Sequence, residues 1–158
     1  MGDMTIRFAV IGVAVALALA PGDAGAFTGG DEADRPGGAD YAAGKTASAS
    51  GDYPAAIEYL TKSAAADPES PDSHNLLGYS FRKMGNVEKA FEHYREALSI
   101  DPKHRGANEY IGELYIETDN LAKAEEHLDV LDGACFFGCP EYTDLKEAVT
   151  AYKASHGG

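Results

Sequence analysis

The chain has 158 residues, with 26 acidic and 13 basic side chains and a formal net charge of −13. This length suffices for one domain with a hydrophobic core. The acidic balance argues against nucleic-acid binding, which requires a basic face that displaces counterions, and against electrostatic docking on anionic lipid. Surplus negative charge of this kind is expected on solvated faces, where it keeps a protein soluble.

The first 26 residues have the pattern of a secretory signal peptide. Arg7 gives a short positive segment, residues 8–20 (FAVIGVAVALALA) are apolar and uncharged, and the small residues 24–26 (AGA) follow. Cleavage after Ala26 would leave a mature chain of 132 residues. The alternative is an uncleaved N-terminal anchor, although the apolar stretch is shorter than the roughly 20 residues that span a bilayer.

The signal peptide predicts a periplasmic or otherwise exported protein that has no membrane association after cleavage. The next segment, residues 27–38, contains four glycines and a proline. Such a segment cannot bury an apolar face, so it is predicted to be a flexible leader.

From residue 39 the sequence repeats with a period of 34 residues. Segments 51–60 (GDYPAAIEYL), 85–94 (GNVEKAFEHY) and 119–128 (DNLAKAEEHL) align without gaps. Two sets of small residues recur at the same spacing: Gly44, Gly78 and Gly112, and Ala56, Ala90 and Ala124. A period of 34 indicates a unit of two helices joined by a turn.

The second unit illustrates the two helices. The first is predicted from Asp72 to Met84 and the second from Val87 to Ile100, with Gly85 at the turn. Apolar side chains of the second helix recur at i, i+3, i+4 and i+7, which is the spacing of one helix face. That face consists of Val87, Ala90, Phe91, Tyr94, Ala97 and Leu98.

These units resemble the tetratricopeptide repeat, whose pattern is W-x2-L-G-x2-Y followed by A, F, A and P. In the second unit His74 replaces the Trp, and in the third Phe136 replaces the Pro. The first unit is weaker, because Ala43 and Ala47 replace large residues. The matching residues are Gly44, Ala56, Leu60 and Pro68; Leu77, Gly78, Phe81, Ala90, Tyr94, Ala97 and Pro102; and Ile111, Gly112, Tyr115, Ala124 and Leu128.

The resemblance implies an all-α, right-handed superhelical solenoid of three hairpins, at about residues 37–70, 71–104 and 105–136. Residues 137–158 would add a turn with a cysteine and a capping helix from Pro140 to Ser155. One stripe of that helix is apolar and suits the open end of the array: Tyr142, Leu145, Val149 and Tyr152.

The resemblance also implies a concave groove, lined by the first helix of each unit, that binds a protein or peptide partner. The groove would be basic and aromatic near the first two units and acidic at the third. The alternative is that these are ordinary solvated positions with no selected partner. The predicted groove residues are Tyr41, Lys45, Asn75, Tyr79, Arg82, Lys83, Glu109 and Glu113.

Two cysteines, Cys135 and Cys139, leave three interpretations open. A disulfide would pin the joint between the last repeat and the capping helix, since a separation of four residues at a turn allows the required geometry. A thiol pair at a helix N-terminus could instead serve redox or copper chemistry, with His127 as a further ligand. The C-x3-C-P string is similar to that of Sco-type copper chaperones. The third interpretation is two free buried thiols.

The remaining polar residues give no sign of catalysis or of a resident metal or cofactor. The five histidines form no metal-binding motif, and no Gly-rich phosphate loop or G-x-S-x-G elbow occurs. They are His74, His93, His104, His127 and His156.

The sequence thus predicts an exported, monomeric, non-enzymatic adaptor or scaffold without a cofactor. One alternative is a periplasmic copper-binding or redox protein that uses the cysteine pair on the same scaffold. A third hypothesis is a structural protein that assembles end to end.

Overall fold

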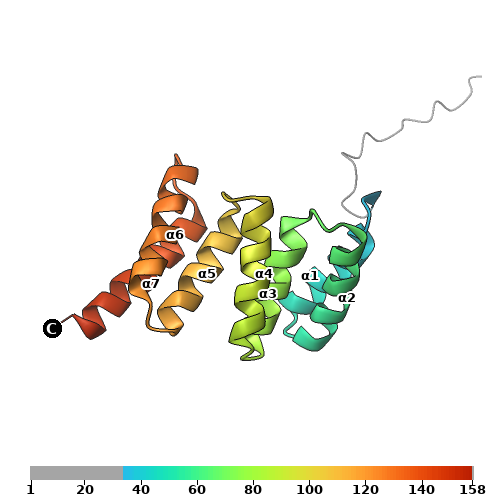
Figure 1. Cartoon of the computed structure of the whole chain (residues 1–158), viewed down its shortest axis with the longest axis horizontal. Helices are drawn as coiled ribbons and strands as arrows, with labels where there is room; N and C mark the ends of the chain where they lie inside the picture. The colour runs from blue at the N-terminus through green and yellow to red at the C-terminus, as the bar shows by residue number, and fades with distance from the viewer. Residues whose placement is uncertain (1–33, 158) are drawn as a thin grey trace, which may run out of the picture.

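The computed structural model describes residues 34–157, which form seven α-helices and no strand. The predicted signal peptide, its cleavage point after Ala26 and most of the predicted leader lie outside the described residues. Three helix hairpins follow one another along the molecule and a last helix closes the array (Figure 1), so the predicted all-α solenoid is confirmed. The helices are α1 (Gly38–Ala49), α2 (Tyr53–Ala66), α3 (Pro71–Lys83), α4 (Val87–Ile100), α5 (Arg105–Glu117), α6 (Leu121–Ala134) and α7 (Pro140–His156).

Each hairpin turns on the same two positions of the 34-residue period. The first has a left-handed backbone, with φ of 81° at Gly51, 77° at Gly85 and 57° at Asp119. Glycine adopts such angles without strain, and Asp tolerates them better than most residues. The side chain of the second position accepts a hydrogen bond from a backbone N–H in the first turn of the next helix, at Asp52, Asn86 and Asn120. The turn therefore ends one helix and caps the next.

The helices of the first two hairpins cross at glycines that have no room for a side chain. A Cβ at Gly44 would lie 2.5 Å from Leu60 Cγ, and a Cβ at Gly78 would lie 2.6 Å from two carbons of the Tyr94 ring. Leu60 and Tyr94 are both fully buried. In each case the covering side chain belongs to the second helix of the same hairpin.

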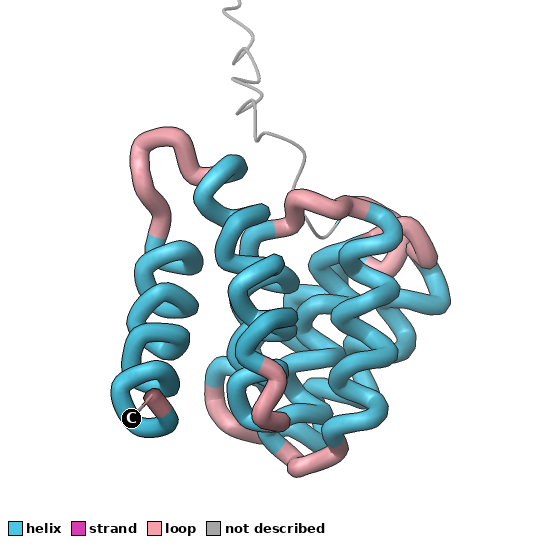
Figure 2. Tube along the Cα trace, turned by 60° about the vertical axis from the view of Figure 1, so that its left-hand side comes forward, coloured by secondary structure: helices cyan, strands magenta, loops and turns pink. Residues whose placement is uncertain are grey.

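The third hairpin is closed by α7, which packs against both α5 and α6. Leu145 of α7 covers Gly112, where a Cβ would lie 2.6 Å from Leu145 Cδ2. Leu145, Val149, Ala124 and Leu131 form the last of three apolar clusters in the described residues. Figure 2 shows the loop between α6 and α7 projecting at one end of this hairpin. None of the helices within residues 34–157 is long and apolar enough to cross a bilayer.

The end of the predicted leader differs from the expectation of flexibility. Gly38 is buried as the first residue of α1, and Gly37 precedes it with φ of 71°. A Cβ at Gly37 would lie 2.6 Å from the carbonyl oxygen of Ser63. The two glycines therefore let the chain pack closely on α2, and helix α1 begins at Gly38, within the segment predicted to be the leader.

Candidate partner-binding groove

An aromatic hollow is lined by residues of α1, α2, α3 and α5. Tyr79 packs against Tyr53 and Tyr110, with ring centroids 6.2 Å and 5.1 Å apart respectively. The Lys83 ammonium lies 5.2 Å from the centroid of the Tyr79 ring, and Lys45 lines the same hollow. Burial raises the pKa of Tyr79, and it raises the pKa of Tyr110 to about 12. The hollow therefore presents aromatic rings and two cationic side chains on one surface.

Two of these aromatic residues were missed from the sequence. Tyr53 is the first residue of α2, whereas only first helices were expected to line the groove. Tyr110 follows the predicted groove residue Glu109 by one position, which is about 100° around a helix. A search for aromatic residues next to each predicted groove position would have found Tyr110. Nothing in the repeat pattern marks Tyr53.

The side chain of Arg82 is largely buried and forms ion pairs with two carboxylates of α5. Its Nη1 donates a hydrogen bond to Glu113 at 2.6 Å, and its Nη2 donates one to Glu117, also at 2.6 Å. Burial alone lowers the pKa of the Arg82 guanidinium, but the hydrogen bonds to Glu117 and Glu113 outweigh it and raise this pKa overall. The expectation of a basic groove at the second unit is therefore wrong at Arg82, because α5 neutralises its charge.

The acidic end of the groove is more enclosed than expected, because α7 adds carboxylates to it. Glu109 is only 8% exposed. Burial raises the pKa of Glu109 to about 7, and the neighbouring charges of Glu113, Asp144 and Glu141 act in the same direction. One oxygen of Glu141, Oε2, is buried and has no hydrogen-bond partner. The capping helix therefore takes part in the electrostatics of the groove.

Asn75 lies in a polar pocket between the starts of α3, α5 and α7. It is 7% exposed, and its Oδ1 has no hydrogen-bond partner. A Cβ at Gly106 would lie 3.0 Å from Asn75 Nδ2, so the glycine allows α5 to approach Asn75 closely. Further side chains line this pocket: Asp72, Asp101, Lys103, His104, Arg105 and Glu141.

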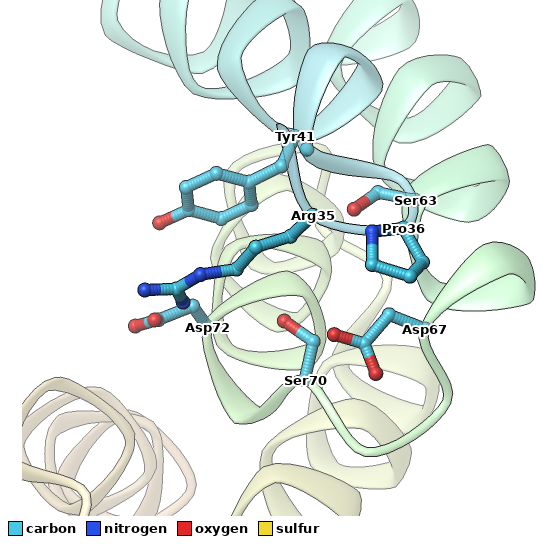
Figure 3. A pocket seen from close by; sticks show the side chains of 8 residues that line it. Arg35, Pro36, Tyr41, Ser63, Asp67, Ser70 and Asp72 are labelled. Atoms are coloured by element: carbon cyan, nitrogen blue, oxygen red, sulfur yellow. The ribbon is translucent and has the colours of Figure 1, made fainter. Parts of the chain in front are cut away.

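Tyr41 lies nearly buried at the N-terminal end of the array, beside a small hollow below the start of α1. Figure 3 shows Arg35 extending past Tyr41 toward Asp72. The hydrogen bond between His104 and Asp72, at 3.0 Å, lowers the pKa of Asp72, and the charges of Lys45 and Arg35 add to this effect. Lys45 links Tyr41 to the aromatic hollow, since its ammonium lies 5.6 Å from the centroid of the Tyr41 ring and it also lines the hollow.

The histidines have structural contacts that repeat with the period of the chain. His93 stacks on Phe81, and His127, 34 residues later, stacks on Tyr115. Burial lowers the pKa of both His93 and His127. Within residues 34–157, no group of three or more His, Cys, Asp or Glu side chains is arranged to hold a metal ion.

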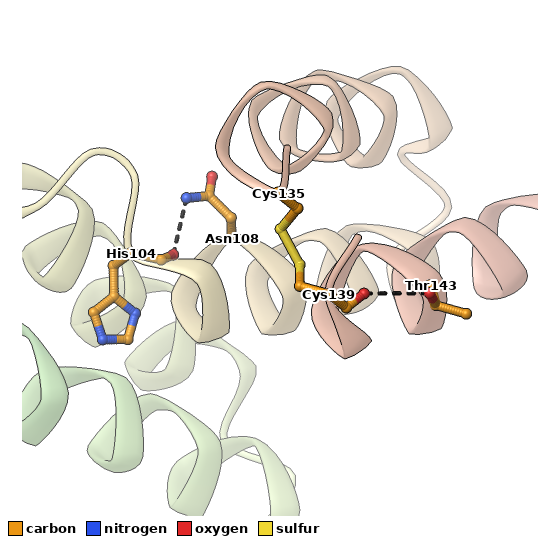
Figure 4. The surroundings of a disulfide bond; sticks show 5 residues. All are labelled: His104, Asn108, Cys135, Cys139 and Thr143. Atoms are coloured by element: carbon orange, nitrogen blue, oxygen red, sulfur yellow. Dashed lines mark hydrogen bonds between the residues drawn. A yellow bond between two sulfur atoms is a disulfide. The ribbon is translucent and has the colours of Figure 1, made fainter. Parts of the chain in front are cut away.

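The loop between α6 and α7 is short and carries two exposed aromatic rings. The sulfur atoms of Cys135 and Cys139 contact each other, and their Cα atoms are 5.5 Å apart (Figure 4). The hydroxyl of Thr143 donates a hydrogen bond to the Cys139 carbonyl in the first turn of α7. Phe136 and Phe137 are 88% and 97% exposed. This geometry suits a disulfide, whose formation in the cell stays a prediction.

Two sequence models of the tetratricopeptide repeat match the chain, one over residues 41–105 and the other over residues 81–149. Together they span more than half of the 158 residues. No curated protein sequence matches the chain.

Solved structures from several organisms share the fold. The TPR2B domain of yeast Sti1, in a complex with pHsp70, is 18% identical with a TM-score of 0.69, over 76% of this chain and 98% of that one. The Sgt2 TPR domain of Aspergillus fumigatus is 22% identical with a TM-score of 0.68, over 77% and 81%. The Yersinia enterocolitica chaperone SycD, in complex with a peptide of the translocator YopD, is 20% identical with a TM-score of 0.63, over 74% and 88%. At these identities the likeness shows the fold alone.

Proposed function

Because the chain belongs to the tetratricopeptide repeat family, we propose that it is an adaptor that binds a peptide segment of a partner protein in its groove. The aromatic hollow of Tyr53, Tyr79 and Tyr110 carries this proposal. Tyrosine supplies a large, rigid contact area at low entropic cost, so it often anchors a partner. Several structural neighbours are complexes with a peptide or protein, which supports the same type of function here.

A peptide-binding experiment tests the hollow directly. The chain contains no Trp, so the fluorescence of a Trp-containing peptide reports on the peptide alone. The peptides of the library carry one Trp each and have blocked N- and C-termini. We expect some of them to bind the parent protein, and to bind the Tyr79→Ala variant at least about tenfold more weakly. Tyr59→Ala is the matched control, since it removes an exposed tyrosine from α2 outside the hollow. Equal losses in both variants, or no binder at all, would contradict the proposal.

The proposed location is outside the cytoplasm, and residues 7–26 carry that part of the proposal. Expression of the full chain in a bacterial host with two membranes should yield a periplasmic protein that begins at Phe27. Intact-mass measurement of the periplasmic fraction checks this. A full-length, membrane-bound product would instead indicate an uncleaved anchor.

We propose that the mature protein is a monomer, which light scattering across concentrations tests.

Copper binding or redox activity of the cysteine pair has less support. Cys135 and Cys139 contact each other, and the described residues offer no third ligand arranged with them for a metal ion. A thiol count on the oxidised protein separates the two functions. A closed pair favours a purely structural role, whereas two reactive thiols with tight Cu(I) binding would favour the alternative.

A further inference from the structure

The polar pocket beside the aromatic hollow contains buried oxygen atoms that lack donors. Asn75 Oδ1 on α3 and Glu141 Oε2 on α7 are both buried, have no hydrogen-bond partner and line the same pocket. Asn75 is more than nine-tenths buried. Buried polar atoms in folded proteins are nearly always paired, so two unpaired acceptors in one pocket require an explanation. Both atoms accept hydrogen bonds, and the missing group must therefore be a donor.

The charge around these acceptors is negative. Glu109 and Glu113 of α5 and Glu141 and Asp144 of α7 influence one another, as the raised pKa of Glu109 shows. Arg82 opposes these charges at Glu109, but it already forms ion pairs with Glu113 and with another carboxylate of α5. The pocket therefore favours a donor that also carries positive charge.

The cations of the chain that line this pocket do not supply that donor. Lys103 and Arg105 are exposed, and in the described part of the chain neither forms an ion pair with Glu141. His104 uses both ring nitrogens elsewhere. Its Nδ1 accepts a hydrogen bond from Ala107 N, and its Nε2 donates one to Asp72.

We propose that this pocket receives the ammonium or guanidinium group of a lysine or arginine side chain in the bound peptide segment. This inference rests on the proposed peptide-binding function of the groove. The acidic end of the groove would thereby select partner segments with a basic side chain. A primary ammonium or a guanidinium brings several N–H donors with its charge, so it can satisfy Asn75 Oδ1 and Glu141 Oε2 together.

The position of the pocket also predicts a spacing within the partner. Asn75 and Tyr79 are four residues apart on α3, and Glu109 and Tyr110 are adjacent on α5. Four residues of a helix rise about 6 Å, whereas two residues of an extended peptide advance about 6.6 Å. A basic residue in the pocket therefore places an aromatic or aliphatic residue, two positions away, over the aromatic hollow.

The first test uses blocked seven-residue peptides in which one Trp stands two positions from a variable residue. Lysine and arginine peptides should bind at least about tenfold more tightly than the norleucine and glutamate peptides. Glu141→Gln should remove most of this preference and leave the norleucine peptide unaffected. Glu147→Gln is the control, because it removes a charge from the exposed side of the same helix. Arg105→Gln should leave lysine binding unchanged or strengthen it, since it removes a competing cation.

The outcomes separate the two proposals. Equal affinity for norleucine and lysine peptides would overturn the cation pocket and leave the peptide groove intact. A preference for acidic residues, or for a free C-terminal carboxylate, would also overturn it. Absence of binding by every peptide would overturn both, because the pocket requires a bound segment.

A second test follows the proton on Glu109. A bound cation beside Glu109 should lower its pKa, so binding of the lysine peptide near pH 7 should release protons. The charged groups that face Glu109 are Arg82 of α3, Glu113 of α5, and Glu141 and Asp144 of α7. Their net negative charge holds the proton on Glu109 in the free protein, and a bound cation would oppose that charge. Calorimetry in buffers of different ionisation enthalpy measures it. Binding without proton release, or equal release in Glu109→Gln, would contradict the assignment.

Discussion

The second and third hairpins bury equivalent glycines under different partners. Gly78 of α3 is covered by Tyr94, which lies in the same hairpin, whereas Gly112 of α5 is covered by Leu145 of the capping helix. Leu128 holds the position of Tyr94 in the third unit and is only partly buried. The 34-residue period therefore marks where two helices approach closely, but it does not determine which helix supplies the covering side chain. At the end of the array, α7 takes over a contact that is internal to the hairpin elsewhere.

The largest expected effect comes from removing that covering side chain. Leu145→Ala should lower the free energy of unfolding by about 2–5 kcal/mol, because Leu145 is fully buried and the variant leaves a cavity. Leu128→Ala should cost less than half as much, since Leu128 is partly exposed. Urea denaturation followed by circular dichroism measures both. A larger loss in Leu128→Ala would mean that the third hairpin closes on itself, as the second does.

The next effect distinguishes the two glycines themselves. Gly78→Ala should destabilise the protein by about 1–3 kcal/mol, because the added methyl group meets the ring of the fully buried Tyr94. Gly112→Ala should cost less. Its methyl group also meets a fully buried side chain, but Leu145 lies on the last helix, which can shift, and the gain in helix propensity offsets part of the cost. Thermal unfolding of the two variants, compared with Gly51→Ala at a left-handed turn, would show whether α7 yields as expected.

The attachment of α7 should depend moderately on its cysteines. Serine at both Cys135 and Cys139 should lower the free energy of unfolding by up to about 2 kcal/mol, since a closed loop of this length restricts the unfolded chain only slightly. Denaturation with and without reductant measures the contribution. The reductant should destabilise the parent protein and leave the double variant unchanged. Identical curves for the parent in both conditions would show that the pair is not bonded.

The smallest expected effect concerns the acidic end of the groove and depends on pH. The folded chain holds the Glu109 proton up to about pH 7, whereas an unfolded chain releases it near pH 4.3. Stability should therefore decrease as the pH rises from about 4.3 through 7. Glu109→Gln should be equal in stability to the parent at pH 4 and more stable at pH 8, by about 1 kcal/mol once solvent screening reduces the effect of the shift. The control Glu147→Gln should show no such pH dependence.

The fold could be predicted from the sequence because the turn residues and the 34-residue repeat place the helices at the same positions. The glycines at 44, 78 and 112 and the turns at 51, 85 and 119 mark the same unit, so the helix positions were predictable. The ends of the helices in the second hairpin agree with prediction to within about one residue.

The candidate site was less predictable, because it depends on contacts between units. The sequence identified Arg82 as an anchor for a partner, but Glu113 and Glu117 of the next unit bind it. Asn75 was expected to lie exposed in the groove, but it is buried and α5 approaches it closely at Gly106. Periodicity describes the face of a single helix, whereas burial and ion pairing depend on side chains that vary from one unit to the next.

Because every hairpin carries its own turn and its own helix cap, the array can in principle be lengthened. A second copy of residues 71–104 would meet a helix hairpin on each side, but Arg82 of the first copy would face Tyr79 and Lys83 of the second in place of Glu113 and Glu117. The terminal helix cannot be moved in the same way, because Leu145 fits the third hairpin at Gly112. An added unit would therefore have to precede α5, so that the last hairpin and its cap stay together.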